Sequence, residues 1–171
     1  MGMVLSFVIV LLIAADQIIK SVVNRQILPD QHIPVIEDFF YLVNRKNSGA
    51  AWSFLAGAAW GIYVLAAVSA LVTVVLLIAL FRTSHTGLRV ALTMITAGSV
   101  GNLIDRIRLK AVTDYLDFHF GRYIFPTFNL ADMLIVCGTI LLMIFVLIDQ
   151  TLLDQPLLPW QKRRDMTDHE S

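Results

Sequence analysis

Four long apolar stretches constrain the fold of this chain more than any other feature of its sequence. A helix needs about 20 predominantly apolar residues to cross a hydrocarbon core of about 30 Å, and in lipid it satisfies its backbone hydrogen bonds internally. We therefore predict an all-α integral membrane protein with four transmembrane helices. The predicted spans are Val4 to Val23, Ala58 to Phe81, Leu88 to Ile104 and Thr127 to Ile148.

The composition agrees with a membrane protein and narrows the possible chemistry. Of the 171 residues 57% are hydrophobic and 15% are charged, and the net charge is zero, so nothing indicates a nucleic acid as partner. Cys137 is the only cysteine, which excludes an internal disulfide and a cysteine metal cluster. We expect it to be a small apolar packing residue. The four histidines do not have the spacing of a metal-binding helix, so we expect no metal and no cofactor.

The connections between the spans are unequal in length. The second and third spans are joined by the short turn "RTSHTG", whereas the other two connections are long. The first long connection contains the β-leaning run "VIEDFFYLVN", and the second alternates apolar and polar residues from Val112 to Phe120. Because a four-span chain alternates sides, both long connections lie on one face of the membrane. We predict that they build a small β-leaning platform and an interfacial segment, with residues 1–153 as one domain and 154–171 as a polar tail.

The basic residues do not decide the orientation in the membrane. The short connection and the tail hold five Lys and Arg, and the two long connections with their flanks hold the other eight. A raw count by the positive-inside rule places the long connections in the cytoplasm. The compact "QKRR" of the tail instead favours a cytoplasmic tail, so the charge pattern leaves the orientation open.

Polar residues occur in three spans, each time at the end next to a long connection and at helical spacing. Residues three or four apart share one face of a helix, so these residues predict one polar cluster at headgroup depth. The pairs are Asp16 with Lys20, Asn102 with Arg106, and Asn129 with Asp132.

Structural roles could account for some of these polar residues. Asp16 with Lys20 could be an ion pair that only sets the helix register, Asn102 a hydrogen-bond bridge between helices, and Arg106 a headgroup anchor. Asp132 is harder to explain in this way, because it lies about a turn and a half inside an apolar run, where an acid is costly.

Asp114 precedes the fourth span and is the candidate partner of Asp132. Two carboxylates at a shielded site cannot both ionise cheaply, so the pair holds one shared proton. Such a pair can hydrolyse a peptide bond, because one acid takes a proton from water while the other donates to the scissile carbonyl. Asp117 is an alternative partner, but the alternation places it on the opposite face of its segment. The chain contains no serine in a G-x-S-x-G elbow.

Five motifs, in this order along the chain, resemble those of the lipoprotein signal peptidases, the type II signal peptidases of bacteria. No single motif is decisive, but all five spaced through a four-span chain are specific. They are "DQIIK" at Asp16 to Lys20, "NSGAAWS" at Asn47 to Ser53, "GNLIDR" at Gly101 to Arg106, "VTDY" at Val112 to Tyr115 and "FNLAD" at Phe128 to Asp132.

The resemblance implies an aspartic endopeptidase that removes the signal peptide of diacylglyceryl-modified prolipoproteins, cleaving before the lipid-bearing cysteine. It implies Asp114 and Asp132 as the catalytic dyad. The supporting or substrate-binding positions that it implies are Asn47, Gly49, Ala50, Asn102, Arg106 and Asn129, with Asp16 and Lys20 as a supporting pair of unassigned role. Tyr115 departs from the family's commoner Phe, and Met133 from a smaller residue.

The resemblance also implies a place in the cell. The site faces the extracytoplasmic side of the bacterial inner membrane, and both termini, including the tail 154–171, lie in the cytoplasm. We expect the protein to act as a monomer on its lipid-modified substrate in the lipid bilayer.

Two functions of other classes remain as alternatives. A small proton-coupled transporter would also carry acids in its spans, although here the acids gather at one end and the halves show no inverted repeat. A non-catalytic assembly or substrate-binding membrane protein would use the aromatic loops without needing paired aspartates.

Overall fold

The computed structural model describes residues 2–29, 31–49 and 60–148. Within them lie four helices that are long and apolar enough to cross a membrane, which confirms the four predicted spans. Ala50 and the tail at 154–171, for which the sequence made predictions, fall outside the described residues. The helices are α1 (Gly2–Gln26), α2 (Gly61–Arg82), α3 (Thr86–Leu109) and α4 (Leu130–Ile148).

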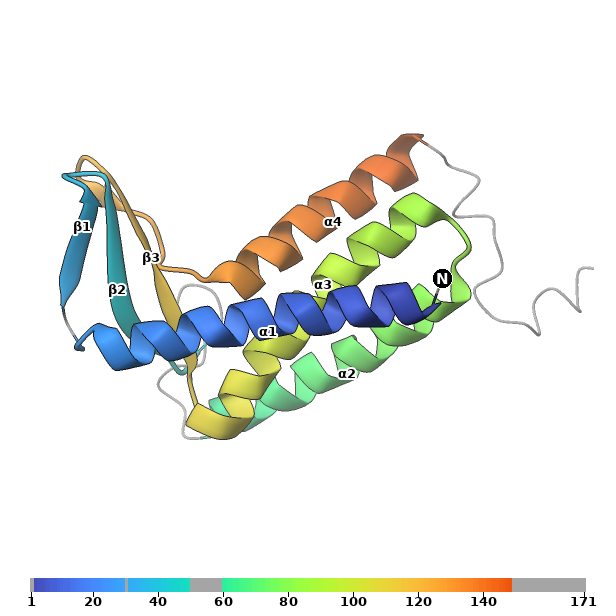
Figure 1. Ribbon diagram of the computed structural model, residues 1–171, viewed down its shortest axis with the longest axis horizontal. Helices are drawn as coiled ribbons and strands as arrows, with labels where there is room; N and C mark the ends of the chain where they lie inside the picture. The colour runs from blue at the N-terminus through green and yellow to red at the C-terminus, as the bar shows by residue number, and fades with distance from the viewer. Residues whose placement is uncertain (1, 30, 50–59, 149–171) are drawn as a thin grey trace, which may run out of the picture.

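Helix α3 lies at the centre of the bundle and packs against each of the other three helices (Figure 1). In its most apolar window 56% of the residues are buried, against 17% or less for the other spans. Close approach to α4 depends on glycine, because a Cβ at Gly98 would lie 2.3 Å from the backbone oxygen of Ala131. The most polar span is therefore the one surrounded by protein, and the more apolar spans face the lipid.

A four-stranded antiparallel sheet lies at one end of the bundle (Figure 1). Its order is β1-β2-β3-β4, so each long connection contributes one hairpin and both share one structure, as predicted. The alternating segment forms a strand over its whole predicted length, whereas the short β4 has too few residues to show a period in the sequence. The strands are β1 (His32–Ile36), β2 (Phe40–Asn47), β3 (Val112–Phe120) and β4 (Tyr123–Ile124).

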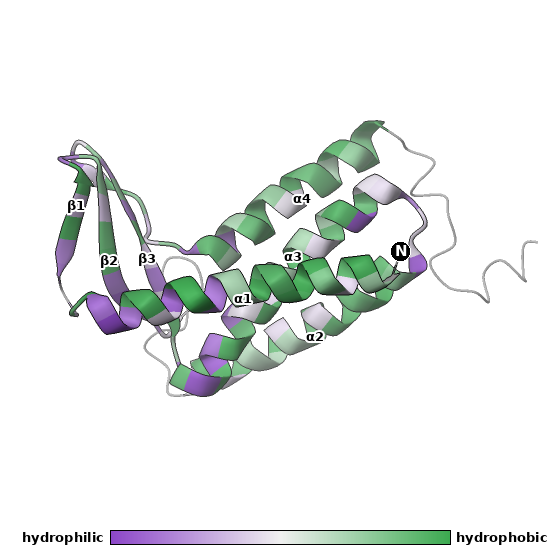
Figure 2. Ribbon diagram, viewed as in Figure 1, coloured by the Kyte–Doolittle hydropathy of each residue, from purple (hydrophilic) through white to green (hydrophobic). Residues whose placement is uncertain are grey.

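The sheet is held to the bundle by apolar packing on the last turns of α1. Val23 of α1, Ile27 directly after the helix and Tyr115 of β3 form a buried cluster, against which Leu42 and Leu130 also pack. Hydrophilic residues gather on α1 and α3 at this same end (Figure 2). The packing brings β3, the end of α1 and the start of α4 together around the polar cluster.

Two expectations about the spans need correction. Helix α4 begins at Leu130 and not at Thr127, so Asn129 precedes the helix and Asp132 lies in its first turn. Cys137 is exposed on α4 and lines a cavity beside this helix, so it does not pack in the protein interior.

Candidate active site

Asp114 lies on β3, and two asparagine side chains hold its carboxylate. Its side chain is buried, and one oxygen accepts a hydrogen bond from Asn47 Nδ2 at 3.1 Å. The other oxygen accepts from Asn129 Nδ2 at 2.7 Å. Asn47 belongs to β2, the neighbouring strand, so the sheet and the residue before α4 fix this carboxylate together.

Asp132 lies in the first turn of α4 and is held by two donors of its own. Its Oδ1 accepts from Asn102 Nδ2 at 2.7 Å, and its Oδ2 accepts from the backbone N–H of Asn129 at 3.2 Å. Asn129 Oδ1 in turn accepts from the N–H of Asp132 at 3.1 Å. This reciprocal pair is a capping box, with Asn129 as the N-cap and Asp132 three residues later. The acid is placed at the helix N-terminus, where the helix dipole favours negative charge.

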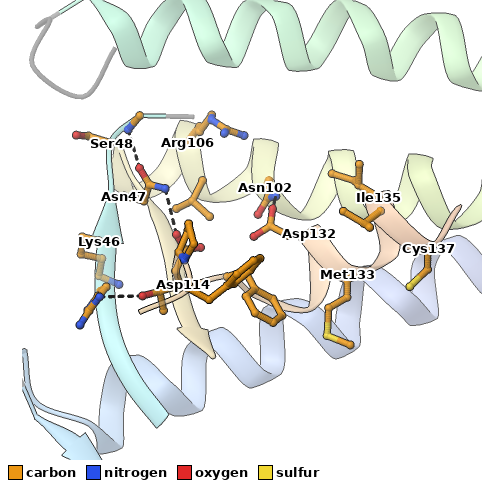
Figure 3. A pocket seen from close by; sticks show the side chains of 18 residues that line it. Lys46, Asn47, Ser48, Asn102, Arg106, Asp114, Asp132, Met133, Ile135 and Cys137 are labelled. Atoms are coloured by element: carbon orange, nitrogen blue, oxygen red, sulfur yellow. Dashed lines mark hydrogen bonds between the residues drawn. The ribbon is translucent and has the colours of Figure 1, made fainter. Parts of the chain in front are cut away.

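Asn129 joins the two aspartates. Its side chain is fully buried, its oxygen caps the helix that carries Asp132, and its amide nitrogen donates to Asp114. Figure 3 shows Asp132 directed from α4 toward the strand that carries Asp114. A single side chain therefore sets the position of each acid relative to the other.

The environment of Asp114 favours its protonated form. Burial, followed by the negative charge of Asp132, raises the pKa of the Asp114 carboxyl from 3.8 to about 7, against the opposing hydrogen bonds from Asn129 and Asn47. A carboxyl with this pKa can hold a proton near neutral pH. The predicted pair of acids with a shared proton is thus consistent with the geometry.

Both aspartates line one cavity of about 700 Å³ (Figure 3). At the sheet end the lining is polar and includes Asn47, Gly49 and Arg106, and along α4 it is apolar and includes Met133 and Val136. Met133 and Val136 are also exposed on the outer surface of the helix. The cavity can therefore hold an extended polar backbone beside the acids and apolar groups alongside α4.

The Asp16–Lys20 ion pair is part of a buried polar network that reaches the dyad. Lys20 Nζ lies 3.0 Å from Asp16 Oδ2 and 3.3 Å from Asp105 Oδ2. It also donates to Asn102 Oδ1 at 3.0 Å, which leaves the Asn102 amide nitrogen directed at Asp132. Lys20 thus orients Asn102, the neighbour of Asp132, and a role limited to the helix register does not account for this contact.

Several polar residues near the site were not singled out from the sequence, among them Asp105 and Lys46. Asp105 Oδ2 accepts a hydrogen bond from the N–H of Thr113, the residue directly before Asp114. Asp105 lies three residues after Asn102, and this helical spacing could have identified it from the sequence. Lys46 lines the cavity and donates to Thr113 Oγ1 at 2.8 Å. It directly precedes the motif that begins at Asn47. Burial lowers the pKa of Lys46, and the charges of Asp105 and Asp114 oppose that change.

The remaining predicted residues occupy distinct places. Gly49 is buried, and its N–H donates to Asn47 Oδ1 at 2.9 Å, which fixes the asparagine. Arg106 lines the cavity, with Nη1 3.5 Å from Ser69 Oγ of α2. Asp117, the alternative partner, lies 3.5 Å from Arg45 and 2.9 Å from His119, and Arg45 also lines the cavity. In the described part of the chain no three His, Cys, Asp or Glu side chains are grouped to hold a metal.

Comparison with known proteins places this site in a family. The family model described as "Signal peptidase (SPase) II" matches residues 8–148. The chain belongs to the signal peptidase II family. It is therefore a peptidase and an integral membrane protein of bacterial type. This membership favours the peptidase hypothesis over the transporter and the assembly protein.

Curated relatives and solved structures agree with the family. A lipoprotein signal peptidase of Bacillus pumilus is 37% identical over 138 residues, covering 81% of this chain and 88% of the relative. One of Ectopseudomonas mendocina is 42% identical over 137 residues, covering 78% and 81%. A solved bacterial membrane enzyme matches with a TM-score of 0.78 at 27% identity, over 86% of this chain and 89% of that one.

Proposed function

We propose that this protein removes the signal peptide from diacylglyceryl-modified prolipoproteins, cleaving before the lipidated cysteine. It acts as a membrane-embedded aspartic endopeptidase whose dyad is Asp114 and Asp132. The observation that carries the proposal is the side chain of Asn129, which joins two carboxylates lining one cavity at the end of a four-helix bundle. Family membership supports the substrate class, and the geometry supports the residues.

The two acids take different roles in the proposed reaction. Asp132, an N-terminal residue of α4 with a donor on each oxygen, is the base that accepts a proton from the attacking water. Asp114, whose pKa of about 7 lets it hold a proton, donates to the carbonyl oxygen as the carbon becomes tetrahedral. When the C–N bond breaks, Asp132 returns its proton to the leaving amine. Asp114 recovers its own proton as the new carboxylic acid re-forms its carbonyl group.

The cavity suits a substrate that is tethered in the bilayer. Its apolar lining along α4 is open to lipid at Met133 and Val136, where the signal segment and acyl chains of a precursor would lie. Asn47, Gly49 and Arg106 line the polar end, where the extended backbone would be held. The scissile bond would then lie near the membrane surface, at the depth of the two acids.

The same arrangement supports one part of the proposed orientation, namely that the start of α1 and the sheet lie on opposite sides of the membrane, and the family resemblance supports the choice of side. The N-terminus lies at the end of the bundle opposite the sheet, and an even number of spans returns the chain to that side (Figure 1). We place the sheet and the cavity on the extracytoplasmic face of the inner membrane, and both termini with the tail 154–171 in the cytoplasm. Catalysis is assigned to a monomer without cofactor, because both acids come from one chain.

Replacement of either acid tests the proposal. Asp114→Asn and Asp132→Asn should each lower cleavage of a purified lipidated precursor by at least about 1,000-fold, because each removes one of two proton-transfer groups. The measurement is the rate of signal-peptide release by protein reconstituted in lipid.

The matched control is Asp38→Asn, which changes an exposed acid of the sheet at a residue with φ of 60°, a conformation that asparagine tolerates. It should cleave at the wild-type rate. Wild-type rates in either dyad variant would refute the assignment.

A further inference from the structure

The backbone N–H groups in the first turn of α4 need hydrogen-bond acceptors that the two acids of the proposed dyad do not supply. The first N–H groups of a helix have no partner within the helix and need acceptors from elsewhere. The side chain of Asn129 supplies an acceptor to the N–H of Asp132, and its carbonyl oxygen accepts from the N–H of Met133. The N–H groups of Leu130 and Ala131 remain, and both lie beside the dyad.

Two other elements supply these acceptors. The hydroxyl oxygen of Tyr115, on β3, accepts from the N–H of Leu130 at 3.1 Å. The Oδ1 of Asp16, on α1, accepts from the N–H of Ala131 at 3.1 Å. The first three amides of α4 are thus held by a strand, by another helix and by the helix's own N-cap.

Both acceptors are themselves held rigidly. Asp16 is fully buried, and its Oδ2 pairs with Lys20 at 3.0 Å and accepts from Gln17 Nε2 at 3.2 Å. The same carboxylate lies against α3, where a Cβ at Gly101 would lie 2.6 Å from Oδ2. Tyr115 is 4% exposed and packs with Val23 in the cluster between the sheet and α1.

The positions of these residues relate them to the reaction. Tyr115 follows Asp114 on β3, so the strand that carries one acid also binds the helix that carries the other. Asp16 places a negative charge at the N-terminus of α4, where the dipole favours it and where an ion pair keeps it in place.

We propose that Tyr115 and Asp16 are positioning residues, which fix the first turn of α4 against β3 and α1 and so set the separation of Asp114 and Asp132. The catalytic consequence rests on the proposed function, but the structural consequence does not. Tyr115 has this role through its hydroxyl group, which accepts from the N–H of Leu130.

Hydrogen exchange tests the structural part without any substrate. In Tyr115→Phe the ring stays and the acceptor is lost, so the N–H of Leu130 should exchange about 10-fold faster, as expected for one lost hydrogen bond. The matched control is Tyr41→Phe, because Tyr41 also accepts a backbone N–H, that of Asp38 at 3.0 Å, in the turn between β1 and β2. The control should leave exchange at Leu130 unchanged. Unchanged exchange in Tyr115→Phe would overturn the proposal.

Kinetics with the lipidated precursor test the catalytic part. A displaced Asp132 should stabilise the transition state less while substrate binding stays nearly the same. We therefore expect kcat to fall about 5-fold in Tyr115→Phe and about 50-fold in Asp16→Asn, with KM within 2-fold of wild type. Tyr41→Phe should keep both constants. If Asp16→Asn does not fold, Tyr115→Phe still decides the question.

The outcomes separate the two proposals. Faster exchange at Leu130 with unchanged kcat would overturn the positioning role in catalysis and leave the proposed function intact. Failure of the wild-type protein to cleave the lipidated precursor would refute the proposed function, while the exchange result would still decide whether Tyr115 holds α4.

Discussion

At the scale of single residues, asparagines decide the chemistry available to the two acids. Asn47 and Asn129 each donate to Asp114, and these bonds oppose the rise in its pKa that burial causes. Amide donors stabilise the carboxylate without adding a charge to the site. The pKa of about 7 is therefore the result of burial and the charge of Asp132, which raise it, and of the two hydrogen bonds, which lower it.

The pH dependence of cleavage should reveal this balance. In the proposed mechanism Asp114 donates a proton, so kcat/KM should fall as the pH rises above about 7. Asn47→Ala removes a bond that lowers the pKa, so the pKa of Asp114 should rise, the basic limb should move by about half a unit or more to higher pH, and the maximal rate should fall.

A matched variant distinguishes this effect from a loss of stability. Asn44→Ala removes another β2 amide, which donates to the carbonyl of Ile27 and contacts neither acid. Its basic limb should stay at the wild-type pH. A limb that moves to lower pH in Asn47→Ala would contradict the proposed role of this hydrogen bond.

At the scale of elements, the close contact of α3 with α4 sets the depth of the site. Gly98 lies against the backbone of Ala131, one residue before Asp132, and Asn102 follows one turn later on α3. The absence of a side chain at Gly98 lets the helices approach closely enough for Asn102 to reach Asp132.

Gly98→Ala should therefore lower kcat more than its loss of folding stability alone would. Its methyl group would meet the Ala131 oxygen at 2.3 Å, which should push the first turn of α4 outward, lower kcat by at least about 10-fold and destabilise the fold by about 1 to 3 kcal/mol. Gly138→Ala is the control, because its Cβ would meet the Ala91 oxygen at 2.9 Å, farther along α4. Thermal unfolding and kcat are measured for both. Equal loss of kcat at equal destabilisation would contradict a specific effect on the site.

At the scale of the whole molecule, the bundle and the sheet divide the protein into a membrane part and one polar end. The sheet is built from both long connections, and the short turn between α2 and α3 lies at the other end (Figure 1). Our proposed orientation makes the sheet extracytoplasmic and this turn cytoplasmic.

Cysteine labelling in intact cells tests that orientation. In a Cys137→Ser background, Arg122→Cys in the turn between β3 and β4 should react with a membrane-impermeant maleimide from outside. Ser84→Cys, in the turn between α2 and α3, should react only after the membrane is permeabilised. The reverse pattern would place the site in the cytoplasm.

The sequence by itself determined the features that depend on neighbouring residues. Four apolar runs were enough to predict the four membrane spans, because a helix in lipid satisfies its own backbone hydrogen bonds. The alternation from Val112 to Phe120 sufficed for β3, because a strand turns successive side chains to opposite faces. The motifs alone also sufficed to place Asp114, Asp132 and Asn129 among the candidate site residues.

Only the tertiary structure decided how these residues meet. Asp16 and Ala131 are 115 positions apart, and their contact depends on how α1 and α4 are placed around α3. Tertiary packing also decides the contact of Asp105 with the N–H of Thr113 on β3. It likewise decides the exposure of Cys137, which depends on the rotation of α4. Local patterns specify which residues are polar or apolar, whereas the packing and rotation of helices specify which of them share a hydrogen bond. For this reason the role of Asn129 as the link between the two acids emerges only from the fold.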